Sequence, residues 1–348
     1  MEILERKAYA RAGVIGNPSD GYYGKTISVI LKQYFACVTL YEWDELEIVM
    51  NENNTRFRSI DELVQDVRKH GYYGGVRLVK ATIKRFAEYC RANGIFLHDR
   101  TFSVRFETNI PRQVGMAGSS AIIVATLRCL MEFYGVDIPK YLQPSLVLSV
   151  EQGELGITAG LQDRVIQVYE GMVYMDFSHD KMRTENGLEY GFYEPILLDS
   201  VENEHDSGAL PPLYVAFKTE VSEPTEIVHN NLRHRWNDGV PEVHRAMQKF
   251  AELSDLARTA IQERNWARLG ELMDANFDLR RSICKIASGQ IQMVELARSA
   301  GVSAKFAGSG GAIIGTFPDE DTYRKLECVM RENACTVHKV YKKKENPF

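Results

Sequence analysis

The amino-acid sequence predicts an α+β fold in two halves, and three observations carry that prediction. The N-terminal half mixes Val-, Ile- and Thr-rich segments, which are typical of strands, with long stretches of helical periodicity. A polar and irregular stretch over residues 178–210 then indicates a domain boundary. The second half has three long helical patterns between one strand and a later strand–turn–strand segment. Strands and helices that are segregated in this way are typical of α+β domains.

In the N-terminal half, residues 5–50 predict strands around a turn-rich loop at Gly16–Gly21. Residues 60–93 predict helical structure that is interrupted by the glycines near residues 71–75. The remaining expected elements are a strand over 102–111, helices over 119–134 and 144–154, and a strand over 171–177.

The second half begins with an expected strand over residues 212–217. Helical patterns follow over 241–262, 266–283 and 288–300, then a strand, a glycine turn and a strand over 303–317, a helix over 319–333 and a strand over 335–342. We therefore expect two domains, residues 1–205 and residues 206–348.

Composition excludes several classes of partner. The net charge is −5 and the Lys and Arg residues form no long cluster, which argues against nucleic-acid or anionic-membrane binding. The six cysteines are scattered, which argues against a zinc site or disulfide framework and favours a reducing compartment. The charged first residues lack a signal-peptide core, and no apolar run reaches the roughly 18 residues of a membrane span. We expect a cytoplasmic protein that acts on small molecules.

The stretch from Pro111 to Ala125 carries the strongest functional signal. It indicates the end of a strand, a glycine-rich turn, Ser119 and Ser120, and then an apolar run long enough for a helix. Small residues let the backbone approach a ligand, and a helix start offers unpaired N–H groups and partial positive charge, which suits a polyphosphate. Serine is also a preferred N-cap residue, so the same pattern is compatible with a helix cap alone.

Two other glycine-containing segments resemble nucleotide motifs but lack the context. Ser19 to Thr26 ends in Gly-Lys-Thr, yet the first glycine of a P-loop is replaced by Ser19 and the following residues favour a strand. Gly308 to Gly311 lies between two expected strands, whereas a dinucleotide-binding fingerprint opens a helix. We expect neither a P-loop nor a Rossmann site.

Three segments together resemble the GHMP kinases, the small-molecule kinases named for galactose, homoserine, mevalonate and phosphomevalonate. The segments are Ala10–Asp20, Pro111–Ala121 and Lys305–Gly311. The resemblance covers roughly residues 5–340 and implies an N-terminal domain like the second domain of ribosomal protein S5, a ferredoxin-like C-terminal domain and an active site in the cleft between them. It also implies ATP and Mg²⁺ as cofactors. One departure is the central Gly-Met-Ala-Gly-Ser-Ser, where the family more often has Gly-Leu-Gly-Ser-Ser.

The resemblance implies a nucleotide site and a metal site. The expected nucleotide-binding residues are Pro111, Gly115, Met116, Ala117, Gly118, Ser119, Ser120, Ala121, Gly308, Ser309 and Gly310. The expected metal ligands are Ser119 or Ser120 together with Glu151. Glu151 is favoured over Glu154 because it lies 12 residues before Asp163, the spacing of the acidic pair in galactokinase-like members.

The resemblance also implies the catalytic pair. Asp163 is expected to act as the general base, with Arg11 beside it. By the residues alone, Asp163 and Arg164 can equally form an ordinary surface ion pair, and Arg11 can be a solvent-facing strand residue.

Within the family the resemblance is strongest to members that phosphorylate D-glucuronate at C1 in the salvage of that sugar acid. Asn17 and Asp20 are expected to bind sugar hydroxyls, although Asn-Pro-Ser-Asp-Gly is also a good turn by itself. Tyr23 and its neighbour Tyr22 are expected to stack on the sugar, although aromatic pairs are also often simply packed. The substrate carboxylate needs a cation, for which we expect Lys25 or Arg281. The other cations considered are Arg233, Arg235 and Arg280. There are two alternatives to a kinase of glucuronate. One is a kinase of galacturonate or galactose, and the other is a sugar sensor without catalysis.

Overall fold

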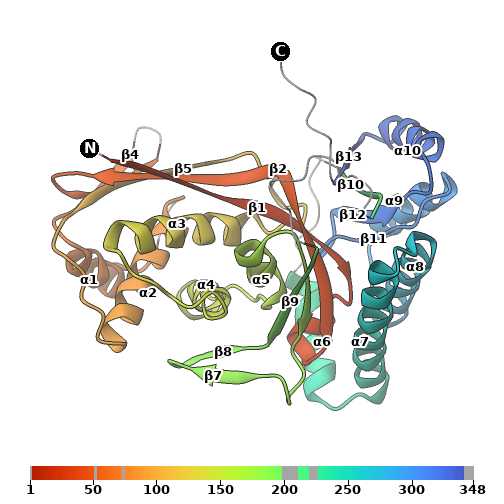
Figure 1. Cartoon of the computed structure of the whole chain (residues 1–348), viewed down its shortest axis with the longest axis horizontal. Helices are drawn as coiled ribbons and strands as arrows, with labels where there is room; N and C mark the ends of the chain where they lie inside the picture. Colours follow the sequence, from red (N-terminus) through yellow and green to blue (C-terminus); the bar gives the residue numbers. More distant parts are fainter. Residues whose placement is uncertain (1, 51–52, 73–74, 198–210, 219–225, 341–348) are drawn as a thin grey trace.

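The computed structural model describes residues 2–50, 53–72, 75–197, 211–218 and 226–340, and it contains two main β-sheets joined through a pair of long helices. Figure 1 shows the larger sheet and its helices on one side of the molecule, and the smaller sheet with its helices on the other. The predicted boundary at residues 205 and 206 lies outside the described residues.

A long antiparallel pair, β1 (Ile3–Ile15) and β2 (Lys25–Glu42), is the backbone of the larger sheet. In the first part of β1, exposed and buried residues alternate. From Ala10 to Ile15 every residue is buried. The alternation is lost because helices α3 (Gly118–Tyr134) and α5 (Gln162–Tyr169) cover one face of this segment. Helices α7 (Pro241–Gln262) and α8 (Trp266–Ile283) pack against it from the smaller half. The functional end of β1 therefore lies in the interior, between the two halves.

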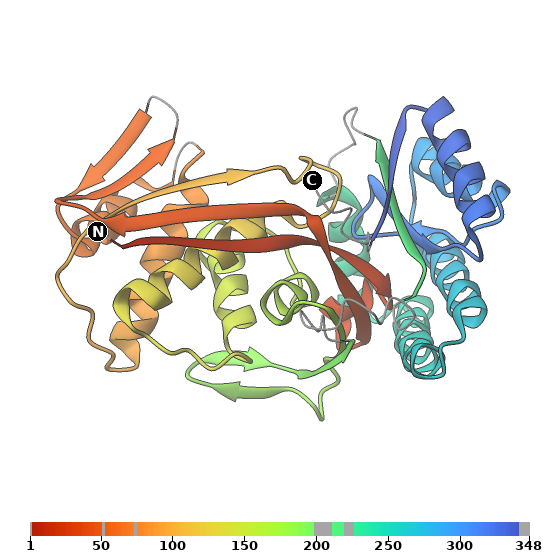
Figure 2. The same ribbon diagram turned by 45° about the horizontal axis from the view of Figure 1, so that its top comes forward.

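The larger sheet has the strand order β4-β3-β5-β2-β6-β9, with β1 paired to β2. The other strands are β3 (Leu46–Met50), β4 (Asn53–Phe57), β5 (Phe102–Thr108), β6 (Met172–Asp176) and β9 (Phe192–Leu197). Figures 1 and 2 show helices gathered on one face of this sheet. They are α1 (Ile60–His70), α2 (Arg77–Ala92), α3 (Gly118–Tyr134), α4 (Gln143–Ser149) and α5 (Gln162–Tyr169).

The smaller sheet is antiparallel, with the order β11-β12-β10-β13. Its strands are β10 (Leu213–Lys218), β11 (Lys305–Phe306), β12 (Ala312–Thr316) and β13 (Cys335–Lys339). Its helices are α6 (Glu226–Asn237), α7 (Pro241–Gln262), α8 (Trp266–Ile283), α9 (Ser288–Ser299) and α10 (Glu320–Glu332). One strand, helices, two strands, a helix and a last strand form the βαββαβ arrangement of a ferredoxin-like domain, as expected.

Most predicted elements are confirmed to within a few residues, including the helix after the glycine turn and the three long helices of the second half. The segment after Thr26 is a strand, which rules out a P-loop there. The irregular interpretation of 178–210 is wrong for its first part, where β7 (Arg183–Glu185), β8 (Leu188–Tyr190) and β9 form. Helices α5 and α6 were not predicted.

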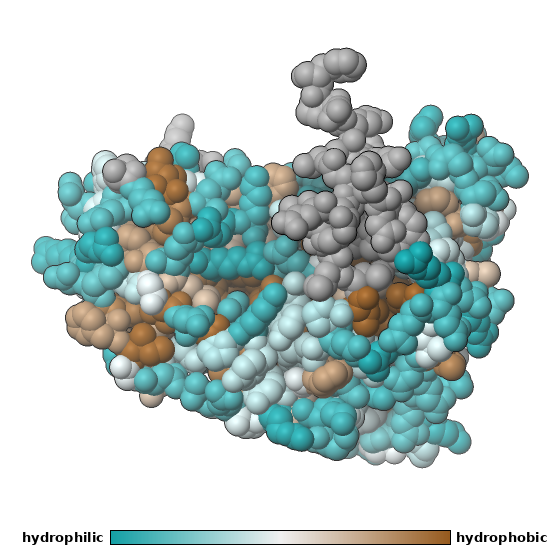
Figure 3. Space-filling view, in the orientation of Figure 1, coloured by the Kyte–Doolittle hydropathy of each residue, from teal (hydrophilic) through white to brown (hydrophobic). Residues whose placement is uncertain are grey.

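None of the helices in the described ranges is long and apolar enough to cross a membrane. The face shown in Figure 3 is mostly hydrophilic, and its hydrophobic residues form only small scattered groups.

Candidate active site

A cavity of about 960 Å³ opens where the end of β1, the loop after it, the glycine-rich segment before α3, the start of α5 and the β11–β12 turn meet. Its lining includes Arg11, Asp20, Ser119, Asp163 and Ser309. These residues come from all three glycine-containing segments and from α5, so the fold brings together positions that are far apart in the sequence.

The central glycine segment turns sharply into α3. Gly115 has φ +71° and Ala117 has φ +59°, and Ala117 stands at the N-cap position without a side-chain capping bond. Ser119 and Ser120 lie inside the first turn of the helix, so the interpretation of these serines as a helix cap is wrong. Ser119 is exposed, whereas Ser120 is buried and its hydroxyl donates to the Ala117 carbonyl at 3.2 Å. The helix start thus has N–H groups that no side chain caps, which suits an anion.

The C-terminal glycine turn approaches this segment closely. A Cβ on Gly308 would lie 2.4 Å from the Gly115 carbonyl oxygen, and one on Gly115 would lie 2.6 Å from the Gly310 carbonyl oxygen. Arg280 donates to the carbonyls of Gly308 at 2.8 Å and Ser309 at 3.2 Å, which holds the turn in place. Only glycine permits this contact between the two turns.

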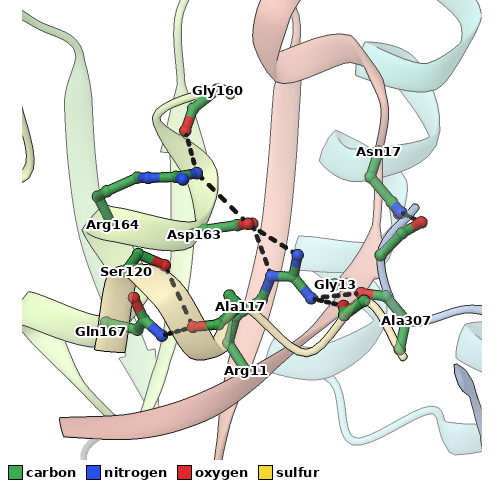
Figure 4. A network of polar contacts seen from close by, with 12 residues as sticks. Arg11, Gly13, Asn17, Ala117, Ser120, Gly160, Asp163, Arg164, Gln167 and Ala307 are labelled. Atoms are coloured by element: carbon green, nitrogen blue, oxygen red, sulfur yellow. Dashed lines mark hydrogen bonds and ion pairs between the residues drawn. The ribbon is translucent and has the colours of Figure 1, made fainter. Parts of the chain in front are cut away.

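Arg11 and Asp163 form a two-pronged ion pair in the cavity wall (Figure 4). Arg11 Nε donates to Asp163 Oδ1 at 2.6 Å, and Nη2 donates to Oδ2 at 2.8 Å. Arg11 is buried, and Nη1 donates to the carbonyls of Gly115 at 2.6 Å and Ala307 at 3.3 Å. The two residues predicted to be neighbours therefore lie in contact, and the surface pair considered for Asp163 does not describe its setting.

Arg164 continues the network toward Glu151. Its Nη1 lies 3.4 Å from Asp163 Oδ2 and donates to the Gly160 carbonyl, while Nε donates to Glu151 Oε2 at 2.6 Å. Arg164 Nη2 also donates to Glu151 Oε2. Glu151 lies in a π-helical turn, Val150–Glu154, and is 2% exposed. Burial raises the pKa of Glu151, and the neighbouring Arg164 opposes that shift.

Asp20 lies beside this network. Burial and the nearby Asp163 carboxylate raise the pKa of Asp20 to about 6, against the opposing effects of a hydrogen bond with the Gln162 backbone and of Arg164 and Arg11. A Cβ on Gly160 would lie 2.1 Å from Asp20 Oδ2, so the carboxylate occupies space that only a glycine leaves open. Asp20 therefore faces the same part of the cavity as Asp163.

Asn17 lines the cavity but its side chain is committed to protein contacts. Lys305 Nζ donates to Asn17 Oδ1 at 2.6 Å, to the Gly13 carbonyl at 2.6 Å and to the Phe306 carbonyl at 2.7 Å. Asn276 Nδ2 donates to the Asn17 carbonyl at 3.3 Å. These contacts fasten the loop after β1 to the smaller half.

Several predicted residues do not line the cavity. Lys25 binds Asp255 at 2.8 Å, Tyr23 is exposed and stacks on His179, and Arg281 binds Glu295 on the surface of α8. Ala121 is fully buried in α3, and Gly310 contacts Gly115 without being part of the lining. The other predicted residues all line the cavity.

Sequence reasoning missed three contributors to this site. The sequence assigns no role to Lys305, although this residue begins the third glycine-containing segment. It indicates Arg164 only as a surface partner of Asp163 and Arg280 only as a possible carboxylate binder. No local pattern indicates any of these contacts, because each joins segments that are distant in the sequence.

One end of the cavity is apolar. Between the start of α2 and β5, its lining has the apolar side chains of Leu78, Phe106, Ile110 and Ile122, with Arg77 and Thr108 beside them. This end has the character of a site for a flat, apolar group with few polar contacts.

Similarity to known proteins covers both halves. The sequence matches the family described as GHMP kinases N terminal domain over residues 77–171 and that described as GHMP kinases C terminal over residues 257–334. Two proteins of Arabidopsis thaliana are similar over most of their length. Probable glucuronokinase 2 is 42% identical and Glucuronokinase 1 is 41% identical, each over 93% of this chain and 87% of the relative.

Solved structures share the fold. A galactokinase of Lactococcus lactis complexed with galactose has a TM-score of 0.77 at 15% identity, covering 97% of this chain and 93% of that chain. The mevalonate kinase of Methanococcus jannaschii has a TM-score of 0.71 at 15% identity, covering 97% of each chain. At this identity the likeness establishes the α+β fold with its N- and C-terminal domains.

Proposed function

The chain belongs to the GHMP kinase family of small-molecule kinases, and we propose that it transfers the γ-phosphoryl group of ATP to the C1 hydroxyl of D-glucuronate. The observation that carries this proposal is a carboxylate, Asp163, held by Arg11 in a cavity between two glycine turns. The two Arabidopsis relatives are named as glucuronokinases, and their similarity to this chain supports the choice of sugar acid and reaction class.

ATP would lie along the cavity from its apolar end to the start of α3. Phe106 and Leu78 offer apolar surface for the adenine ring, and Gly115 to Ser120 offer backbone N–H groups for the phosphates. Gly308 and Ser309 close the phosphate region from the other side. The close contact of the two glycine turns supports this placement, because it forms a narrow backbone cradle.

The residues present fit a magnesium ion that accompanies the nucleotide. Glu151 and the two serines line one cavity, and the hydrogen bonds from Arg164 Nε and Nη2 both reach Glu151 Oε2, which leaves Oε1 for a cation. Within the described part of the chain no three His, Cys, Asp or Glu residues cluster as metal ligands, which suits an ion that takes one or two protein oxygens and several phosphate oxygens. When bound, Mg²⁺ neutralises charge on the phosphates. We assign Glu151 and Ser119 or Ser120 to hold it.

The chain's own residues then perform the transfer. The C1 hydroxyl oxygen bonds to the γ-phosphorus, the bond from that phosphorus to the bridging oxygen breaks, and ADP leaves. Asp163 accepts the hydroxyl proton, while Arg11 fixes the position of the carboxylate. Asp20, beside Asp163, accepts hydrogen bonds from neighbouring sugar hydroxyls. Positioning of this kind supplies much of the rate in phosphoryl transfer.

The experiment is a measurement of ADP release with ATP and Mg²⁺ against glucuronate, galacturonate, glucose, galactose and mevalonate. Turnover confined to glucuronate supports the proposal. Preferred turnover of a neutral sugar would keep the kinase and discard the sugar acid. Binding of ATP without turnover of any of these compounds would point to an untested substrate or to a sensor.

A further inference from the structure

A sugar acid needs a cation in the sugar part of the cavity, and this inference rests on the proposed function. We propose that Arg233, on α6, binds the C6 carboxylate of the substrate and makes the enzyme selective for a sugar acid over a neutral sugar. The planar guanidinium matches a carboxylate with two parallel hydrogen bonds.

Three other arginines of the cavity lining are already committed. Arg11 binds Asp163 through two nitrogens, and Arg164 binds Glu151 through two nitrogens. Arg280 donates to the carbonyls of Gly308 and Ser309. A substrate carboxylate on any of them would have to displace protein contacts that shape the site.

Arg77 and Arg112 also line the cavity, but they belong to its nucleotide end. Arg77 begins α2 directly before Leu78 of the apolar lining, and Arg112 directly follows Pro111 in the segment that leads to α3. In a pyranose, C1 and C5 are the two carbons bonded to the ring oxygen. In glucuronate the carboxylate is attached to C5. The cation must therefore lie within a sugar's width of Asp163 rather than beside the adenine.

Arg233 lies at the Asp20 side of the cavity. Its guanidinium lies over the Tyr22 ring at 4.3 Å from the centroid, and a Cβ on Gly21 would lie 2.9 Å from its Nη2. Gly21 and Tyr22 directly follow Asp20, the neighbour of Asp163. Arg233 is exposed and, within the residues that the structure describes, forms no hydrogen bond or ion pair. It is thus a positioned and available cation on the sugar side.

The Tyr22 ring gives the guanidinium a fixed seat. Tyr22 is buried and packs edge-on against Trp236, one turn further along α6 from Arg233, at 5.2 Å between ring centroids. A guanidinium held over the face of a tyrosine ring does not use its N–H groups for that contact. These groups lie in the guanidinium plane and stay available to donate hydrogen bonds. Stacking therefore orients Arg233 without using the hydrogen bonds that a carboxylate needs.

The test compares D-glucuronate with D-glucuronamide, which has the same shape but no charge. The ratio of the two kcat/KM values is measured for the wild type, for Arg233→Gln and for Arg245→Gln, a control at an exposed position of α7 outside the cavity lining. The wild type and the control are expected to favour glucuronate about 10-fold or more. Arg233→Gln is expected to lower that ratio to about 1, through a higher KM for glucuronate, with the KM for ATP unchanged.

An undiminished ratio in Arg233→Gln overturns the assignment, because the carboxylate must then bind elsewhere. If wild-type enzyme does not phosphorylate glucuronate, the proposed function itself fails, and this inference with it. Should Arg233→Gln lose its cooperative thermal transition, Arg233→Lys decides, since lysine keeps the charge without the planar pair of donors. A ratio at least about 3-fold below that of wild type is then expected, and an unchanged ratio overturns the assignment.

Discussion

Arg11 binds both carboxylate oxygens of Asp163 through two of its nitrogens, while its third nitrogen contacts both glycine turns. The Nε–Oδ1 and Nη2–Oδ2 distances are 2.6 and 2.8 Å, and Nη1 donates to the carbonyls of Gly115 and Ala307. One buried guanidinium therefore sets the position of the carboxylate relative to the two segments that would enclose the phosphates. A base must lie within hydrogen-bond reach of its proton, so this arrangement bears directly on the rate.

Asp163→Asn is expected to lower kcat about 10²- to 10⁴-fold, because the amide cannot accept the sugar proton as a carboxylate does. The affinity for ATP is expected to change little, since Asp163 does not belong to the glycine segments. The measurements are ADP release for kcat and a direct titration for ATP. Asp61→Asn, at an exposed position of α1 that pairs with Arg91, is the matched control. Unchanged turnover in Asp163→Asn would remove this residue as the base.

Glu151→Gln is expected to raise the Mg²⁺ concentration needed for half-maximal activity, because a neutral amide is a poorer ligand for a hard cation. The measurement is a metal titration of the rate at saturating ATP and sugar. Glu154→Gln is the comparison, since Glu154 does not line the cavity and binds Tyr72 and Lys84 instead. A metal requirement that shifts with Glu154→Gln, and not with Glu151→Gln, would exchange the roles of the two glutamates.

The sequence was sufficient for most elements and for the three glycine-containing segments, because periodicity and turn residues are local properties. It was not sufficient for the contacts that build the site. Lys305 appears in a strand of two residues, and only the folded chain shows that its ammonium group binds the loop after β1.

The same limit explains the prediction of Arg281 over its neighbours. Adjacent helix positions point about 100° apart, so two arginines in a row face different surroundings. Arg280 faces the cavity and is buried, whereas Arg281 faces solvent and binds Glu295. The sequence contains no signal that distinguishes the two without knowledge of what α8 packs against. The sequence does not distinguish Arg233 either, because its position over the Tyr22 ring depends on how α6 packs in the folded chain.

Asp20 predicts a pH dependence of sugar binding. Its pKa of about 6 means that the carboxylate is mostly ionised at pH 7 and mostly neutral at pH 5, where it loses acceptor capacity. The KM for the sugar is therefore expected to rise as the pH falls below 6, while Asp20→Asn has a high KM without this dependence. Steady-state kinetics between pH 5 and 8 test this. An Asp20→Asn enzyme that keeps the wild-type pH profile would contradict it.

Thermal unfolding gives a second measurement for Asp20. Because the folded-state pKa is raised above the usual value of 3.8, ionisation of this group destabilises the fold increasingly as the pH rises from about 4 through 6. Asp20→Asn removes that effect. The Tm of the variant relative to wild type is therefore expected to be higher at pH 8 than at pH 4, and the reverse order would show that the carboxyl is not buried beside Asp163.

Lys305→Met tests how strongly the loop after β1 is fastened to the smaller half. The ammonium group is buried and serves three oxygens, on Gly13, Asn17 and Phe306, which the variant would leave without this donor. Leaving these buried acceptors without a hydrogen-bond donor is expected to lower the free energy of unfolding by about 3 kcal/mol.

Urea unfolding measures the loss, with Lys249→Met as the control. Lys249 is exposed on α7, where it pairs with Glu252, and its replacement is expected to cost no more than about 0.5 kcal/mol. Equal effects of the two variants would mean that the three contacts of Lys305 contribute no more to stability than a surface ion pair.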